Sequence, residues 1–197
     1  MQLFDFAFDM KYIDVNEAKR IRIPKIKQTI EQKEKRDLKF FTVDEFNEFV
    51  DSAKCYIQNL SSAYHREMGL RRLLMLQFIF LTSCRYGEAA VLEWQNVDIL
   101  LRDIYIRQSW QINLGKVGPT KNLQSVRHIA IDERTANILE EMKAMSNCDF
   151  VFATTHKQPF SNGALNKFMK KVGDYGGMDK NPKDFSTHML RHSHITL

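Results

Sequence analysis

Residues 82–92 read TSCRYGEAAVL, and residues 187–197 read THMLRHSHITL. In the first stretch, Arg85 and Glu88 are three residues apart, so at the start of a helix they would share a face and could form an ion pair. In the second stretch, His188, Arg191 and His192 fall at helical spacings of three and four, which again places them on one face. Two arginines from distant parts of the chain are therefore candidates for a common site.

A pair of arginines in such positions suits the chemistry of a phosphodiester. Its cleavage builds negative charge on two non-bridging oxygens, and a guanidinium gives parallel charge-assisted hydrogen bonds without losing its proton. Removing one preorganised donor of this kind typically lowers a rate about a hundred- to a thousandfold. The exposed N–H groups where a helix starts at Arg85 would favour a phosphate as well. The two stretches together indicate a phosphate clamp.

Both stretches resemble the tyrosine recombinase (phage integrase) family. The residues that carry the resemblance in the first stretch are Thr82, Arg85, Glu88, Leu92, Trp94 and Asp98. In the second, residues 188–192 form a His-x-Leu-Arg-His box, and between them Pro119-Thr120-Lys121 precedes Ser125-x-Arg127, as in the family's lysine hairpin. The chain departs from the pattern at Ser83, where glycine is usual, and at Asn96, where an additional acid is common. Type IB topoisomerases use similar residues, but the Leu-x-Trp string and the histidine box favour the recombinases.

The resemblance implies a site-specific DNA recombinase or integrase catalytic domain. It implies catalytic roles for Arg85, Lys121, His188 and Arg191 and supporting roles for Glu88 and His192. Lys121 would protonate the departing 5′ oxygen, with Lys116 as the alternative. In the family a tyrosine attacks the phosphate of double-stranded DNA and forms a 3′-phosphotyrosyl bond without metal or ATP, so we expect no cofactor. The full-length parent is expected to act as a tetramer on DNA.

The expected nucleophile is missing from these residues. The family's tyrosine follows the histidine–arginine box, whereas all the tyrosines here precede His188 (Tyr12, Tyr56, Tyr64, Tyr86, Tyr105 and Tyr175). The final helix, for which Thr187 is a suitable N-cap, shows no stop signal before Leu197. We therefore expect a chain truncated before its nucleophile, which binds DNA without cleaving it.

Other interpretations of the same residues stay open. The chain could be a non-catalytic DNA-binding protein that retains the arginine pair, or a helical domain in which both arginines serve structural salt bridges. His188 and His192 have a spacing that binds zinc in other folds, but Met189 replaces the glutamate of the H-E-x-x-H motif and Arg191 would repel a cation. They could also be a satisfied pair of core histidines.

Composition adds a basic N-terminal segment. The net charge is +5 and the isoelectric point about 9.1. Residues 11–39 carry ten Lys and Arg against five Asp and Glu, which predicts either a solvated linker or a strap along a DNA backbone. The candidate DNA-binding residues are Lys19, Arg20, Arg22, Lys25 and Lys27. The three cysteines are scattered, which favours a cytoplasmic protein. No apolar run is long enough to span a bilayer, so we expect no membrane partner.

The expected fold is mainly α with a small antiparallel β-sheet, an α+β class like the recombinase catalytic domain. We expect residues 1–10 to be the remnant of the last helix of a core-binding domain, 11–38 a basic linker and 39–197 the catalytic domain, C-terminally incomplete. A capping box at Thr42 and Glu45 predicts a helix start. Further helices are expected at 66–81, 85–94, 133–145, 162–172 and from 187 onward. Strands are expected at 97–101, 104–112 and 125–131, with a hairpin loop at 113–124.

Overall fold

The computed structural model of the chain describes residues 2–21, 40–111, 115–120, 125–178 and 185–196. The chain forms two units, Met1–Arg36 and Asp37–Leu197. In the first unit, α1 (Gln2–Asp9) confirms the helix expected at its start, and a 3₁₀ turn, η1 (Glu17–Arg20), lies within the expected linker. The side-chain Nδ2 of Asn16 donates to Asp5 Oδ1 at 2.8 Å and thereby ties the turn back to α1. Whether this helix is a domain remnant stays a prediction.

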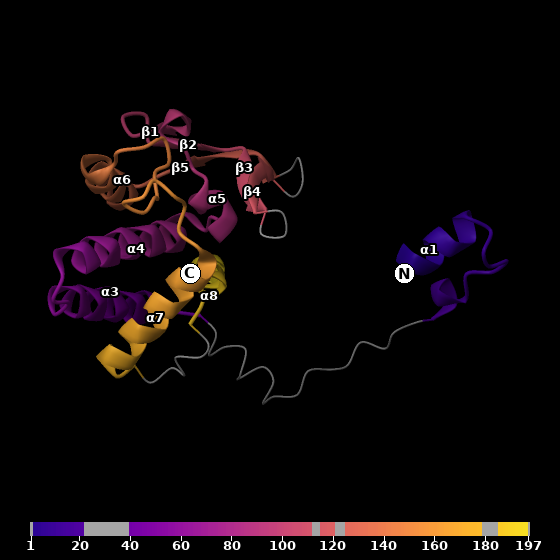
Figure 1. The fold of residues 1–197 in the computed structure, drawn as a ribbon, viewed down its shortest axis with the longest axis horizontal. Coiled ribbons are helices and arrows are strands. Elements are labelled where there is room, and N and C mark those ends of the chain that lie inside the picture. The colour runs from indigo at the N-terminus through magenta and orange to yellow at the C-terminus, as the bar shows by residue number, and fades with distance from the viewer. Residues whose placement is uncertain (1, 22–39, 112–114, 121–124, 179–184, 197) are drawn as a thin grey trace. The chain divides into compact units, whose positions relative to one another are not determined.

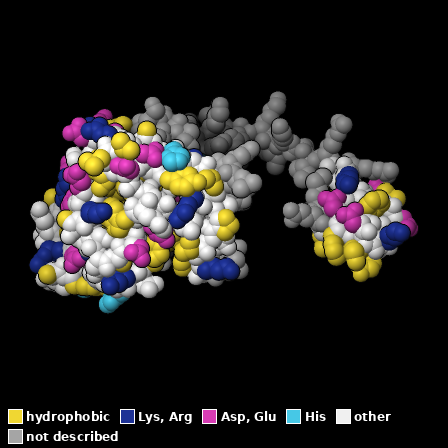
Figure 2. All heavy atoms as spheres, turned by 90° about the horizontal axis from the view of Figure 1, so that it is seen from above, with side chains coloured by type: hydrophobic (Ala, Val, Ile, Leu, Met, Phe, Trp, Pro, Cys, Tyr) yellow, Lys and Arg dark blue, Asp and Glu magenta, His cyan; other side chains and the backbone are white. Residues whose placement is uncertain are grey.

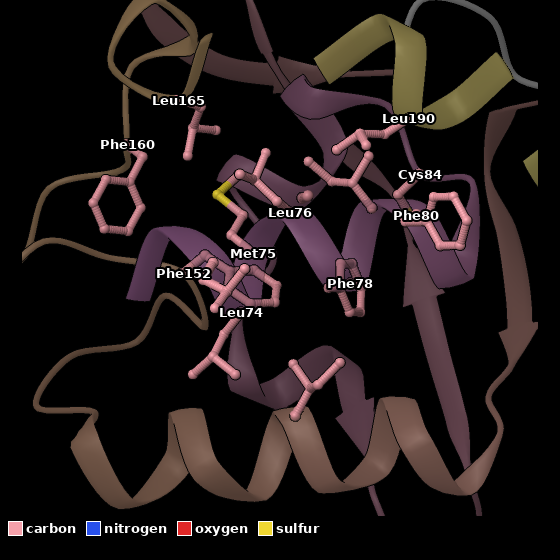
Figure 3. Packing of buried hydrophobic residues seen from close by; sticks show 14 of the residues in the cluster. Leu74, Met75, Leu76, Phe78, Phe80, Cys84, Phe152, Phe160, Leu165 and Leu190 are labelled. Atoms are coloured by element: carbon pink, nitrogen blue, oxygen red, sulfur yellow. The ribbon is translucent and has the colours of Figure 1, made fainter. Parts of the chain in front are cut away.

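The second unit is built around one buried helix. Helix α4 (Ala63–Thr82) buries most of its side chains from Met68 to Thr82 and packs against α3 (Val43–Gln58), α6 (Glu133–Met145), α7 (Asn162–Gly176) and α8 (Thr187–Thr196) (Figure 1). Figure 3 shows Leu74, Met75 and Phe78 of α4 pointing into this core together with Phe152. A helix that is apolar on every side belongs at the centre of a domain. The helix expected at residues 66–81 is confirmed as part of α4.

The helix starts follow local capping chemistry. At Thr42 both halves of the capping box form: Thr42 Oγ1 accepts from the Glu45 amide at 3.2 Å, and Glu45 Oε2 accepts from the Thr42 amide at 2.7 Å. The expectation for Thr187 is wrong, because Thr187 is the first residue of α8 and the Ser186 hydroxyl accepts from the Met189 amide at 3.4 Å. The Thr187 hydroxyl instead donates to Asn162 Oδ1 at 2.8 Å, a bond that joins α8 to the start of α7.

The strands form two small antiparallel sheets. β1 (Val97–Asp98), β2 (Asp103–Ile106) and β5 (Arg127–Ala130) make one sheet in the order β1-β2-β5. β3 (Gln108–Gln111) and β4 (Lys116–Pro119) make a separate hairpin. The single strand expected at 104–112 is therefore interrupted at Arg107, where the chain changes partner from β5 to β4. The loop expected at 113–124 also contains β4.

Helix α5 (Tyr86–Ala90) is shorter than the expected 85–94. After it the chain is drawn into pairing with residues 149–151: the Trp94 amide donates to the Asp149 carbonyl at 2.9 Å and the Val151 amide donates to the Leu92 carbonyl at 2.8 Å. A 3₁₀ turn, η2 (Trp94–Asn96), then leads into β1. Tertiary hydrogen bonds end this helix although its apolar pattern continues. In the described part of the chain, no helix is long and apolar enough to cross a membrane.

Helix α8 is fixed by its buried side. Met189, Leu190 and Ser193 are buried, and Figure 3 shows Leu190 on the core side near Cys84 and Phe80. The Ser193 hydroxyl accepts a 2.7 Å hydrogen bond from the amide of Phe41, at the start of the second unit. This packing leaves the face that carries His188, Arg191 and His192 turned away from the core.

Candidate functional site

The chain makes a tight turn between α4 and α5 that presents Arg85. Ser83 has left-handed backbone angles (φ 55°, ψ 20°) and ends α4. The Thr82 hydroxyl donates to the Phe78 carbonyl at 2.7 Å and accepts from the Cys84 amide at 3.3 Å, which holds the turn. Arg85 is then the N-cap of α5. Its side chain therefore leaves from a fixed turn, half-exposed.

Glu88 lies beneath Arg85 and is 2 % exposed. Its Oε1 accepts from Arg85 Nη1 at 2.7 Å, as the spacing predicted, and its Oε2 accepts from the Arg85 amide at 3.0 Å. A second arginine, Arg127 of β5, donates to both oxygens, to Oε2 at 2.9 Å and to Oε1 at 3.3 Å. Burial by itself would raise the pKa of Glu88, but the hydrogen bonds from Arg127 and Arg85 outweigh it and lower the pKa. The carboxylate therefore stays ionised between two guanidinium groups.

Arg191 reaches the same turn from α8. Its Nη1 donates to the carbonyl oxygen of Ser83 at 2.7 Å. Burial lowers the pKa of Arg191, and the nearby positive charge of Arg85 lowers it further. In the described chain Arg191 forms no ion pair with a carboxylate. The interpretation in which both arginines serve structural salt bridges therefore fits Arg85 and does not fit Arg191.

These arginines line one open cavity of about 420 Å³. We call it the arginine cavity; its lining residues are Thr82, Ser83, Arg85, Ser125, Arg127, His128, Ile129 and Arg191. None of the described lining residues is acidic, and the single carboxylate of Glu88 beneath offsets one of three positive charges. Such an excess of charge in a concave site attracts an anion. Arginine forks fit the oxygens of a phosphate.

The expected catalytic residue His188 and the expected supporting residue His192 both lie on α8 and do not line the cavity. His188 and His192 are exposed, and their Nε2 atoms are 2.8 Å apart. Partial burial of the ring, His192 and Arg191, in that order, lower the pKa of His188. The alternative of a buried core pair is wrong, because both rings are at the surface. In the ranges that the structure describes, no group of three or more His, Cys, Asp or Glu side chains is placed to hold a metal ion.

The lysine expected in the hairpin has two candidates, Lys121 and Lys116. Lys121 lies outside the described residues. Its alternative, Lys116, is exposed on β4 opposite Gln111 and is not among the residues that line the arginine cavity. The assignment of Lys121 stays a prediction.

Sequence reasoning did not assign a site role to Arg127. The signal was present, because residues 127 and 129 of a strand share a face and Ile129 is apolar. An arginine that alternates with an apolar residue on an inward face needs a buried partner, and Glu88 is that partner. The spacing alone did not reveal it, since the two residues are 39 apart in the chain.

The basic segment is described in part. Lys19 pairs with Asp5 at 3.3 Å in an exposed ion pair, which contributes little to stability. Arg20 lies in η1, and its side chain is not described; Arg22, Lys25 and Lys27 lie outside the described residues. On the face seen in Figure 2, basic and acidic side chains of the second unit are interspersed rather than gathered in a patch. DNA binding by this segment stays a prediction.

Residues 39–197 match the sequence model of the phage integrase family. The chain belongs to this family. It is 27% identical over 210 aligned residues to a probable integrase of prophage ps2 from Lactococcus lactis subsp. lactis (strain IL1403), an alignment that covers 98% of this chain and 52% of the relative. It is also 27% identical to the integrase of Staphylococcus phage L54a, over 90% of this chain and 53% of that protein. The chain therefore spans about half the length of the curated relatives it matches.

Solved structures show the same fold at low sequence identity. A variant of the Tn1549 transposon integrase in complex with circular intermediate DNA superposes with a TM-score of 0.69 at 14% identity, over 98% of this chain and 61% of that one. A lambda integrase tetramer bound to a Holliday junction superposes with a TM-score of 0.56 at 17% identity, over 98% of this chain and 50% of that one. The expected fold class, mainly α with a small antiparallel sheet and like the recombinase catalytic domain, is confirmed.

Proposed function

We propose that this chain is the catalytic part of a site-specific DNA recombinase of the integrase type, and that the arginine cavity holds the scissile phosphate of double-stranded DNA. The observation that carries the proposal is the convergence of Arg85, Arg127 and Arg191 on one cavity. Membership of the phage integrase family supports it. A phosphodiester is the anion that both the chemistry and the family favour.

Arg85 and Arg191 clamp the two non-bridging oxygens in this proposal. Each uses Nη1 for a protein partner, Glu88 and Ser83 respectively, and keeps further N–H donors for a ligand. Arg127 takes both oxygens of Glu88, which limits how far Arg85 can collapse onto the same carboxylate. Arg127 is thus a positioning residue, and preorganised donors of this kind stabilise charge as it develops.

The proposed reaction is a transesterification. A tyrosine oxygen attacks the phosphorus, the bond to the 5′ oxygen breaks, and a 3′-phosphotyrosyl bond forms. His188, whose lowered pKa keeps it neutral near pH 7, accepts the proton from the tyrosine, and Lys121 donates a proton to the departing 5′ oxygen. Attack by a 5′ hydroxyl of a partner strand reverses the step and exchanges the strands. The covalent bond conserves the energy of the broken ester, so no cofactor is needed.

The nucleophile in this proposal comes from a tyrosine outside these 197 residues. All the tyrosines of the chain are described, and none lines the arginine cavity. Tyr86, which directly follows Arg85 in the sequence, donates its hydroxyl hydrogen to the Phe160 carbonyl at 2.7 Å instead. The 197 residues accordingly bind DNA and do not cut it. In the parent protein we propose a tetramer on DNA, working in the cytoplasm.

The test is DNA binding by arginine variants. A labelled duplex of about 30 base pairs is titrated by fluorescence anisotropy with the wild-type chain and with Arg85→Ala and Arg191→Ala, at two salt concentrations. Each variant should lose about tenfold or more in affinity, because a charge-assisted hydrogen bond is worth about 1.5–3 kcal/mol. Arg134→Ala, an exposed arginine of α6, is the matched control and should stay within about twofold.

Two outcomes would contradict the proposal. If Arg85→Ala and Arg191→Ala bind DNA as tightly as the control Arg134→Ala does, the proposed phosphate clamp is contradicted. Loss of binding together with loss of the circular dichroism unfolding transition would support a purely structural role, and the charge-retaining variants Arg85→Lys and Arg191→Lys would then decide. A nicked duplex that traps covalent intermediates should give no protein–DNA adduct with these residues, and an adduct would refute the absence of cleavage.

A further inference from the structure

A second cavity of about 380 Å³ lies among α3, α4 and α7. We call it the α7 cavity; its lining residues are Tyr56, Leu60, His65, Gly69, Arg72, Ala164, Lys167, Phe168 and Lys171. His65 and Thr82 lie near opposite ends of α4, which places them about 25 Å apart at the helical rise of 1.5 Å per residue. Since Thr82 lines the arginine cavity, the α7 cavity is a separate site.

The α7 cavity is lined by positive charge without a compensating acid. Lys167 and Lys171 are one turn apart, so they share a face of α7, and both are exposed. Arg72 enters from α4, half-buried, with its guanidinium carbon 5.8 Å from the centre of the Phe160 ring. None of the described lining residues is Asp or Glu. The three like charges around this cavity repel one another, and an anion bound between them would offset that repulsion.

Arg72 also carries an unsatisfied donor. Its Nε is buried and has no hydrogen-bond partner among the residues that the structure describes. Burial lowers the pKa of Arg72, which means that its charged form is poorly compensated where it lies. Buried polar atoms in native proteins nearly always have a partner. An anion that contacts the outer nitrogens of this guanidinium in the cavity would supply the opposite charge.

The wall beside these cations is aromatic. Tyr56 and Phe168 pack edge to face with ring centres 6.2 Å apart. Rings that line a hollow accept a planar ligand ring by stacking or edge contact. A cavity of this size, with apolar walls and a few convergent polar groups, has the character of a small-ligand site rather than of a groove for a duplex backbone.

We propose that the α7 cavity binds a small phosphate-bearing ligand, held by Arg72, Lys167 and Lys171, either as free phosphate groups or as the phosphates of a nucleotide. The planar fork of arginine and the point charges of two lysines suit phosphate oxygens. The aromatic wall would add contacts for a nucleotide base. This site is independent of the proposed recombinase activity.

The test reads each cavity separately by NMR. The ring signals of His65, in the α7 cavity, and His128, in the arginine cavity, are followed while pyrophosphate is added at constant ionic strength, with sodium chloride as the blank. The His65 signal should shift and saturate. The double variant Lys167→Gln/Lys171→Gln should weaken that binding about tenfold, the effect of two exposed ion pairs. The control, Lys157→Gln/Lys170→Gln, removes two lysine charges outside the lining and should bind as the wild type does.

Three titrations distinguish the source of the phosphate. Tighter binding of ADP than of pyrophosphate at His65 would assign a nucleotide, and equal binding would assign the phosphate groups alone. The proposal is overturned if the His65 signal does not move, if it moves equally in both double variants, or if adenosine shifts it while pyrophosphate does not. A duplex that shifts His65 at lower concentration than pyrophosphate would assign the site to DNA instead.

Discussion

Arg191 Nη1 donates a 2.7 Å hydrogen bond to the carbonyl oxygen of Ser83, a residue 108 positions earlier in the chain. Ser83 ends α4 with left-handed backbone angles, and Arg85 follows two residues later. The turn that positions the first arginine therefore also anchors the second. Because the acceptor is a backbone carbonyl, the bond depends on the conformation of the turn and not on the side chain at position 83.

Replacing Ser83 by glycine should stabilise the protein and leave the site intact. A residue with a Cβ in the left-handed region costs about 1–2 kcal/mol, and the extra freedom of glycine in the unfolded chain returns about 0.4–1 kcal/mol of that. Ser83→Gly should raise the free energy of unfolding in urea by about 0.5–1 kcal/mol, with DNA affinity unchanged. Lys157→Gly, at φ 61° in an exposed loop, is the matched control. If Ser83→Gly is less stable than the wild type while Lys157→Gly shows the gain expected at a positive φ, the serine side chain makes a needed contact.

Glu88→Gln should destabilise the protein. The substitution removes the buried charge shared by Arg85 and Arg127, so a loss of about 1–3 kcal/mol in unfolding free energy is expected. The lowered pKa of Glu88 means that its contribution is complete above its unfolded value, about 4.3, and is lost as the pH falls through the folded value. Urea unfolding at pH 7 and at pH 3.5 measures both effects. If the unfolding free energies of the wild type and Glu88→Gln differ by the same amount at pH 7 and pH 3.5, the pairing of Glu88 with Arg85 and Arg127 is contradicted.

His188 should titrate below a free histidine. Partial burial of its ring, His192 and Arg191 lower its pKa, so the unfolded chain binds the proton more readily. Its contribution to stability is therefore complete above about pH 6.5 and declines as the pH falls from there toward the folded pKa. NMR titration of the His188 ring should show the low value, and His192→Gln should raise it by removing a neighbouring positive charge. An unchanged value in His192→Gln would rule out coupling between the two rings.

Gly173→Ala should disturb the packing of α8. A Cβ on Gly173 would lie 1.9 Å from Cε2 of Phe185, which is 1 % exposed and precedes α8. Overpacking of this kind costs about 1–3 kcal/mol, and here the upper end is expected. Because Phe185 leads into the helix that carries Arg191, DNA affinity should fall as well.

Gly163→Ala in the same helix supplies the control. A Cβ there meets nothing within 4 Å, so the variant should gain up to about 1 kcal/mol. Denaturant unfolding and anisotropy compare the two variants. Equal stability of the two alanine variants would show that Phe185 moves aside freely.

Local sequence accounts for the elements that depend only on neighbours in the chain. The helix expected at 133–145 has those bounds in the structure, because an Asp132 cap and apolar spacing act within a few residues. The Thr42 capping box and the Arg85–Glu88 pair are equally local. The face shared by His188, Arg191 and His192 follows from helical spacing alone.

Features that depend on residues far apart in the chain appear only in the folded protein. Pairing with residues 149–151 ended α5 early, and a change of strand partner at Arg107 divided the expected strand. The second arginine on Glu88 and the carbonyl that holds Arg191 come from other elements. Hydrophobic periodicity predicts which face of a helix or strand is buried, but not which residues of other elements pack against that face. The partners of Glu88 and Arg191 are set by packing around α4, and spacing along the chain does not encode that arrangement.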